Sequence, residues 1–252
     1  MLAFHRTGPQ TGPLVVYLHG AGISSWMWHR MIAHQSRMNC ILIDLPGHGD
    51  SRHIMWRDLE DTAAHVEQVI EACAPADEAH LVGLSLGSYV AMTLMIRQPQ
   101  RYTSALLSGI HAGGMTHKPL LKAIFMIAAL TVKWPSRARR TGKMFVEDDG
   151  DLEGFVREAI KTSAQAMRRT GHQVIDYSLP AAAAAIQTRV LIAFGSKEHP
   201  VIRSSNAIFK ETLPRHSMFE AQGLGHGWPG QDPALFARVV QDHIAGRPIA
   251  HP

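Results

Sequence analysis

Cysteines and long hydrophobic runs are scarce in this sequence of 252 residues, and both scarcities exclude classes of protein. Cys40 and Cys73 are the only cysteines, and they are too far apart for a disulfide framework or a metal knuckle. We expect two free thiols, with Cys40 buried. The longest nearly uncharged apolar stretch, residues 119–134, is interrupted by Lys122 and is too short to span a bilayer. The N-terminus lacks the pattern of a secretory signal, so we expect a cytoplasmic protein.

Charge is also sparse, at 18% of residues, with 25 basic and 21 acidic side chains. The formal net charge of +4 is too small to indicate a nucleic-acid partner. Part of the excess is local, because residues 134–143 carry four arginines and lysines. A solvated face is the first interpretation of this basic segment, and contact with an anionic membrane or an acidic partner is the alternative.

Short apolar runs alternate with helical patterns along most of the chain. Such runs are typical of buried parallel strands covered by helices on both faces. The sequence therefore predicts an α/β fold with a doubly wound, mostly parallel sheet of about seven or eight strands. The predicted strands lie at residues 13–19, 40–45, 79–85, 103–109, 188–195 and 217–223.

One long segment breaks this alternation. Residues 110–187 contain no good strand pattern, but they contain apolar and amphipathic helical stretches. An insertion of this length at one point of a sheet predicts a helical lid over the strand ends. We therefore expect a core domain built from residues 1–109 and 188–252, with residues 110–187 as its lid.

The segment "VGLSLGSYVA" places Ser85 between Gly83 and Gly87, after an apolar strand and before a helix. A strand-to-helix turn this tight excludes side chains two residues on either side and raises the serine hydroxyl beyond the strand end. The alternative is a small residue in an ordinary bend. The flanking strand and helix favour a nucleophile.

A nucleophilic serine needs a base and an acid, and the ends of the last two predicted strands offer both. His226 lies in the glycine-rich "GLGHGW" after the last strand, and Glu198 lies in "GSKEHP" after the strand before it. A carboxylate there can accept the imidazole N–H and stabilise the imidazolium. Asp176 is the competing acid, and Asp44 is interpreted as structural.

The first parallel strand ends in "YLHGAG", where small residues let the backbone approach a substrate. The backbone N–H groups of Ala21 and Leu86 are predicted to form a two-donor site for an oxyanion. No metal site is expected, because the histidines of "HAGGMTH" have no element to hold them, and no cofactor is needed.

The motifs "LHGAG", "DLPGHGDS", "VGLSLGS", "GSKEHP" and "GLGHGW" together resemble the α/β-hydrolase fold family, in particular its small lidded esterases and C–C hydrolases. The resemblance implies Ser85 as nucleophile, His226 as base, Glu198 as acid, and Ala21 and Leu86 as oxyanion donors. The chain departs from the family pattern by having glutamate where aspartate is commoner. Its N-terminus is short, so we expect the first of the usual eight strands to be absent.

These features predict a serine hydrolase that cleaves a carboxylic ester, thioester or lactone through an acyl-enzyme. The alternatives are a C–C bond hydrolase or cofactor-free lyase using the same residues, a ligand receptor of the same fold, and a non-catalytic relative. A roof rich in methionine and phenylalanine favours a small apolar or aromatic acyl substrate. The candidate pocket residues are Trp26, Trp28, Met115, Phe125, Met126, Met144 and Phe145, although one of the two tryptophans is expected to pack in the core.

Overall fold

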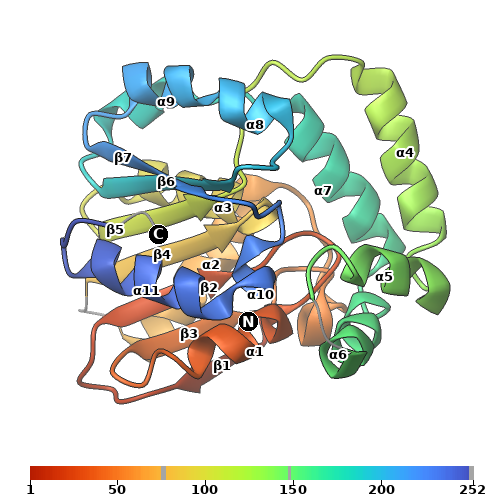
Figure 1. The fold of residues 1–252 in the computed structure, drawn as a ribbon, viewed down its shortest axis with the longest axis horizontal. Helices are drawn as coiled ribbons and strands as arrows, with labels where there is room; N and C mark the ends of the chain where they lie inside the picture. The colour runs from red at the N-terminus through yellow and green to blue at the C-terminus, as the bar shows by residue number, and fades with distance from the viewer. Residues whose placement is uncertain (75–77, 147–148, 250–252) are drawn as a thin grey trace.

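A seven-stranded sheet forms the centre of the computed structural model, which describes residues 1–74, 78–146 and 149–249 (Figure 1). The strand order is β1-β3-β2-β4-β5-β6-β7, and every strand is parallel to its neighbours except the edge strand β1. The predicted doubly wound, mostly parallel α/β fold is therefore confirmed. The strands are β1 (Phe4–Thr7), β2 (Leu14–Leu18), β3 (Asn39–Ile43), β4 (Ala79–Leu84), β5 (Tyr102–Ser108), β6 (Arg189–Gly195) and β7 (His216–Ala221).

Strand β1 has no counterpart among the six predicted strands. Its sequence, FHRT, contains no apolar run, and its residues alternate between half-buried and exposed. It pairs antiparallel with β3, with Phe4 opposite Ile43, so only one of its two edges is bonded. An edge strand of this kind lacks the continuous apolar pattern on which the other six strands were recognised.

Helices cover both faces of the sheet, and alternate residues of β2 show the two layers. Val16 and Leu18 pack in one apolar cluster, and Val15 and Tyr17 pack in the other. The first cluster includes side chains of α2 (Leu59–Cys73), α3 (Leu86–Arg97) and α9 (Asn206–Thr212). The second includes those of α1 (His29–Ile32), α10 (Trp228–Gln231) and α11 (Pro233–Ile244). Two buried faces account for the nearly uninterrupted apolar strands.

Four helices lie between β5 and β6, together at one side of the sheet (Figure 1). They are α4 (Lys118–Leu130), α5 (Pro135–Gly142), α6 (Asp149–Ala159) and α7 (Ala164–Asp176). Ser163 separates the last two, since its hydroxyl accepts the N–H of Ala166 and caps α7. The described part of residues 110–187 contains no strand, and residues 147–148 of that segment lie outside the described ranges.

Shorter helices complete the fold. They are α8 (Pro200–Ser204) and the single 3-10 turns η1 (Ser25–Trp28), η2 (Gly49–Ser51) and η3 (Ala181–Ala185). Within the described ranges, no helix combines the length and apolar content needed to cross a membrane. Cys40 is buried, Cys73 is half-buried, and both are free thiols.

Several histidines are enclosed by the fold as neutral groups. Burial lowers the pKa of His48 to about 3 and that of His243 to about 4. The Nδ1 of His48 lies 2.9 Å from the carbonyl oxygen of Pro46, and the Nε2 of His243 lies 3.1 Å from that of Arg189. Each ring therefore donates one hydrogen bond from its neutral form.

Because these two histidines are buried, we predict that the folded protein loses stability as the pH falls. Below about pH 6.5 the unfolded chain binds protons that the folded chain does not, so the free energy of unfolding falls as the pH falls. Each histidine contributes a slope of up to about 1.4 kcal/mol per pH unit, down to its folded pKa. Urea unfolding from pH 8 to pH 4.5 measures the slope. It should be smaller in His48→Gln and unchanged when the exposed His53 is replaced by Gln; equal slopes in all three proteins would contradict this account.

Candidate active site

Ser85 occupies the turn between β4 and α3, with a φ of 50°. A Cβ on Gly83 would lie 2.6 Å from the backbone nitrogen of Ser88, and a Cβ on Gly87 would lie 2.0 Å from the carbonyl oxygen of Leu18. Neither position has room for a side chain, which is the physical reason for the glycines at this spacing. The positive φ at Ser85 is a backbone strain of the kind found at functional turns.

The end of β5 holds this turn in place. The backbone N–H of Ser85 donates to the carbonyl oxygen of Ser108 over 2.8 Å. The Oγ of Ser88 lies 2.8 Å from the same oxygen and 2.9 Å from the carbonyl oxygen of Gly83. The strained turn is therefore bonded both to its own strand and to the neighbouring strand.

His226 follows β7 and is bonded to Glu198, which follows β6. The Nδ1 of His226 lies 2.9 Å and 3.0 Å from the two carboxylate oxygens of Glu198. An ionised carboxylate can only accept hydrogen bonds, so in the neutral form of the ring Nδ1 carries the proton and Nε2 keeps its lone pair. Glu198 is buried, whereas the His226 side chain is about one-third exposed. The competing acid, Asp176, is exposed on α7 and forms an ion pair with Lys122.

The His226 ring lies against Gly109, the residue that follows β5. A Cβ at Gly109 would lie 2.6 Å from Cε1 of His226, and the φ of 65° also favours glycine. Two residues after His226, the buried Trp228 donates from Nε1 to the hydroxyl of Ser108 over 2.8 Å. Ser108 and Gly109 therefore position both the serine turn and the histidine loop, although no sequence motif marks them.

The buried His19 orients the loop after β2. Its Nε2 accepts the N–H of Leu45 over 2.9 Å, so its Nδ1 carries the proton and donates to the carbonyl oxygen of Gly20 over 2.7 Å. Burial lowers the pKa of His19, which keeps the ring neutral. The Gly20–Ala21 peptide is trans, so the N–H of Ala21 points away from His19.

The second predicted donor, the N–H of Leu86, is the first of α3, and helix N-terminal N–H groups have no partner within the helix. Within the described ranges, neither the N–H of Ala21 nor that of Leu86 donates to another residue. Ala21 and Ser85 line the same cavity. Two free donors therefore flank the serine.

The contacts of Asp44 agree with the structural role predicted for it. Its carboxylate accepts the N–H groups of Ser25 and Asp50, both over 2.8 Å, and these bonds fix the loop after β3. It is not among the residues that line the cavity.

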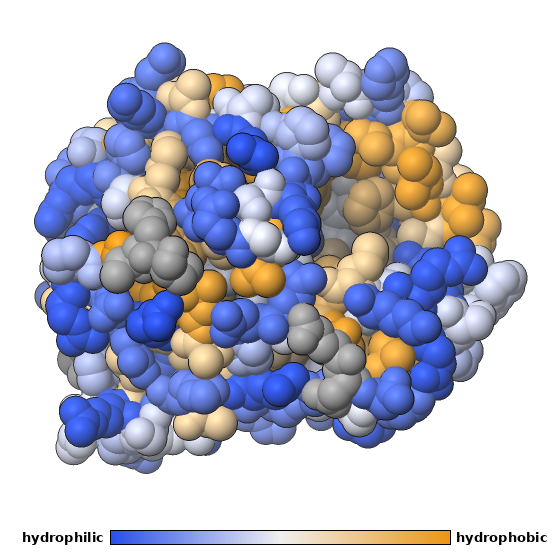
Figure 2. All heavy atoms as spheres, in the orientation of Figure 1, coloured by the Kyte–Doolittle hydropathy of each residue, from blue (hydrophilic) through white to orange (hydrophobic). Residues whose placement is uncertain are grey.

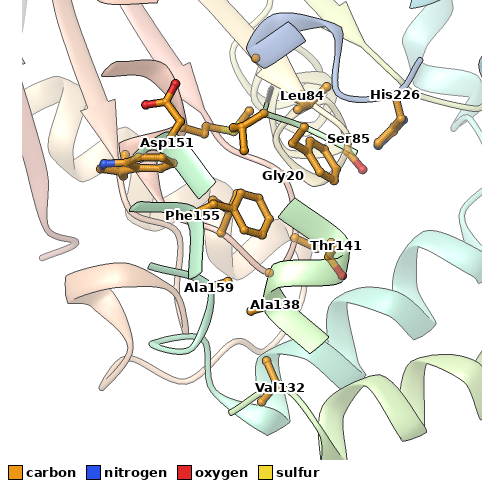
Figure 3. Close-up of a pocket in the computed structure, with 18 of the residues that line it drawn as sticks. Gly20, Leu84, Ser85, Val132, Ala138, Thr141, Asp151, Phe155, Ala159 and His226 are labelled. Carbon is orange, nitrogen blue, oxygen red and sulfur yellow. The ribbon is translucent and has the colours of Figure 1, made fainter. Parts of the chain in front are cut away.

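A cavity of about 250 Å³ joins these groups (Figure 3). Ser85, His226 and the loop after β2 line one side, and residues of α4 to α7 line the other. Most of the lining is apolar and includes Ile23, Trp26, Phe125, Val132, Phe155 and Met167. The volume lies just below the range of about 300–1,000 Å³ that is common for small-molecule sites, so the cavity suits a small apolar group.

The structure places only some of the predicted pocket residues at this cavity. Trp26, Phe125 and Phe145 line it. Trp28, Met115, Met126 and Met144 do not, and their predicted place in the pocket is wrong. Trp28 is fully buried in the apolar cluster that contains Val15 and Tyr17, and it stacks on Phe236. Met126 and Met144 point outward and are 47% and 60% exposed.

The cavity also has a polar part, where Asp151 accepts hydrogen bonds from His29 and Arg30, both over 2.9 Å. In the described ranges, no group of three or more histidine, cysteine, aspartate or glutamate side chains is arranged to hold a metal. Glu198 and His226 therefore have no third side chain beside them that would complete a metal site.

Comparison with known proteins agrees with the fold described above. A model of the alpha/beta hydrolase family matches residues 15–239. Over 96 residues the chain is 35% identical to a pimeloyl-[acyl-carrier protein] methyl ester esterase of Aeromonas hydrophila, a match covering 38% of this chain and 37% of that protein. It therefore spans little more than a third of that relative's length. The 3-oxoadipate enol-lactonase 1 of Acinetobacter baylyi is 22% identical over 253 residues, which cover 96% of this chain and 92% of the lactonase.

Solved structures show the same fold. An esterase from Exiguobacterium antarcticum superimposes with a TM-score of 0.83 at 17% identity, covering 97% of this chain and 95% of the esterase.

The contact between Gly109 and His226 predicts the effect of one added methyl group. In Gly109→Ala the new Cβ displaces the imidazole, and a displacement of about 1 Å can cost about 100-fold in rate. We expect the rate at which a fluorophosphonate labels Ser85 to fall by about that factor. Gly223→Ala is the matched control, because Gly223 also has a positive φ but has no atom within 4 Å of the added Cβ. Equal losses in the two variants would show that backbone strain, not displacement of His226, is responsible.

Proposed function

Because the chain belongs to the alpha/beta hydrolase family, we propose that it is a serine hydrolase that cleaves a small carboxylic ester with an apolar acyl group. The observation that carries the proposal is the arrangement of Ser85, a bonded His226–Glu198 pair and two free backbone N–H groups at the ends of parallel strands. Ester hydrolysis requires these groups and no others from the protein.

In the proposed reaction His226 is the base. Its Nε2 removes the proton of the Ser85 hydroxyl as Oγ forms a bond to the ester carbonyl carbon. Glu198 stabilises the imidazolium that results. The carbon–oxygen bond to the leaving alcohol then breaks, and the imidazolium returns the proton to that alcohol. A water molecule repeats the sequence on the acyl-enzyme and releases the carboxylic acid.

The N–H groups of Ala21 and Leu86 are proposed to stabilise the negative charge that develops on the carbonyl oxygen. The bond from His19 to the carbonyl of Gly20 supports this role, because it fixes the direction of the Ala21 N–H before substrate arrives. A donor oriented in advance is not reorganised during the reaction, and one such donor contributes about 3 kcal/mol to transition-state stabilisation.

Residues 110–187 are proposed to act as a lid. Their helices supply one side of the cavity, and Phe145 lies against the His226 loop. A Cβ at Gly227 would lie 2.7 Å from the carbonyl oxygen of Met144, so glycine in the loop permits this close contact. This packing covers one side of the His226 ring and encloses the acyl group.

The names of two relatives agree with this reaction class. They are a methyl ester esterase and an enol-lactonase, both of which act on a carboxylic ester bond. The natural ester of this chain is proposed only as a class, namely a small ester whose acyl part is apolar or aromatic.

Replacement of the proposed nucleophile and acid tests the mechanism. We expect Ser85→Ala to abolish hydrolysis of p-nitrophenyl esters, because no other group can form the acyl-enzyme. Glu198→Gln should lower kcat by about 100-fold to 10,000-fold, since the imidazolium loses its negatively charged partner. Initial rates with p-nitrophenyl acetate measure both effects.

Two matched variants serve as controls for these substitutions. Ser178→Ala changes an exposed serine, and Asp176→Asn changes the exposed carboxylate that competes with Glu198 in the sequence. Both should retain full activity. The proposed mechanism is wrong if Ser85→Ala retains turnover or if Asp176→Asn loses as much activity as Glu198→Gln.

The apolar cavity predicts a dependence on acyl length. Each buried CH₂ contributes about 0.8 kcal/mol, so kcat/KM should rise about fourfold per carbon until the cavity is full and then fall. Thr141→Phe adds a large side chain at the cavity wall and should move the maximum to a shorter chain. The matched Thr116→Phe, at an exposed position, should not move it. A flat profile from acetate to decanoate would contradict the apolar pocket.

A further inference from the structure

The outer face of α4 is apolar along its whole length. Five large apolar side chains of this helix are exposed: Leu120, Ile124, Met126, Ile127 and Leu130, which we call the α4 face. Leu120 and Ile127 are each 62% exposed and Leu130 is 75% exposed. Figure 2 shows the corresponding hydrophobic surface over α4, while hydrophilic residues cover most of the rest of this view.

The opposite face of α4 is packed. Ala128 and Ala129 are buried in a cluster with Met167 of α7, and Phe125 lies against Gly171, where a Cβ would have no room. The helix is therefore fixed with its inner side on the protein. Because ordinary surface helices present polar residues to water, the α4 face requires another explanation.

Basic residues are frequent in the part of the sequence that contains α4 and α5. Residues 110–146 contain seven lysines and arginines and no aspartate or glutamate. Some of these cations are paired, since Asp176 of α7 bonds to Lys118 and Lys122 and Glu153 of α6 bonds to Arg139. Others are not.

Arg140 and Lys143, at the end of α5, are exposed and have no ion-pair partner in the described ranges. Both belong to the segment that follows the C-terminal end of α4 (Figure 1).

We propose that the α4 face and the exposed cations at the end of α5 dock on an anionic lipid surface. Such a surface offers an apolar phase for Leu120, Ile127 and Leu130 and negative headgroups for Arg140 and Lys143. A second copy of the chain would complete the apolar contact but would bring two acid-free, basic segments together, which costs electrostatic energy. Charge complementarity therefore favours the lipid.

Docking in this orientation places lipid beside the proposed site. The inner sides of α4 and α5 line the cavity through Phe125, Ala138 and Thr141, and Val132 lines it from the connection between the two helices. The outer side of α4 would then contact the bilayer, with the thickness of one helix between the lipid and the cavity. The inference concerns binding alone and does not depend on the proposed hydrolysis.

Vesicle co-sedimentation tests the proposal with the full chain. The probes are vesicles of phosphatidylcholine alone and of phosphatidylcholine with 30% phosphatidylglycerol, a composition chosen to supply roughly the charge of an anionic leaflet. We expect binding to the anionic vesicles and at least a tenfold loss of partitioning in the triple variant Leu120→Ser, Ile127→Ser, Leu130→Ser. Arg140→Ser with Lys143→Ser should lower partitioning about fivefold per residue, and added salt should have the same direction of effect.

Single isoleucine variants provide the matched control. Ile127→Ser should weaken binding, whereas Ile208→Ser, at a 42% exposed position on α9, should not. Circular dichroism and hydrolysis of a soluble ester establish that each variant is folded. Unchanged binding in the triple variant overturns the proposal. So does a dimer that dissociates in the triple variant, in sedimentation velocity, without any binding to vesicles.

Discussion

The junction at the end of β5 is the constraint on which the site depends. The carbonyl oxygen of Ser108 accepts the N–H of Ser85 and lies within hydrogen-bond distance of the Ser88 hydroxyl, while the hydroxyl of Ser108 accepts the indole N–H of Trp228. The next residue, Gly109, leaves room for the His226 ring. One dipeptide thus joins the turn that holds the serine to the loop that holds the histidine, two segments separated by more than a hundred residues of sequence.

The other groups of the site are oriented by bonds of the same kind. His19 fixes the direction of the Ala21 N–H through the preceding carbonyl, and Glu198 fixes the tautomer of His226. His19 and Glu198 are not themselves among the residues that line the cavity. In the proposed mechanism the reacting atoms need little reorganisation because their buried partners already hold them.

The motif residues could be predicted because local geometry restricts their type. Gly83 is required by a contact within the turn, and Gly87 is required by the carbonyl oxygen of Leu18 in the neighbouring strand β2. The ends of parallel strands meet at one edge, so Ser85, Glu198 and His226 could be expected there from their positions in the chain. The roles of Ser108 and Gly109 could not be predicted, because they depend on which strand lies beside β4. The pocket residues of α4 were not predicted correctly for a related reason. Helical spacing marks two faces of α4 but not which one faces the cavity, and the structure turns Phe125 inward and Met126 outward.

The central claim is that Ser85 forms a covalent acyl-enzyme during ester hydrolysis. The most direct measurement mixes the protein with a p-nitrophenyl ester, stops the reaction with acid within the first turnovers, and locates the added mass by proteolysis and peptide mass spectrometry. We expect one acyl group on Ser85, and none in the Ser85→Ala variant. An acyl group on another residue that accumulates at the rate of turnover would contradict this claim.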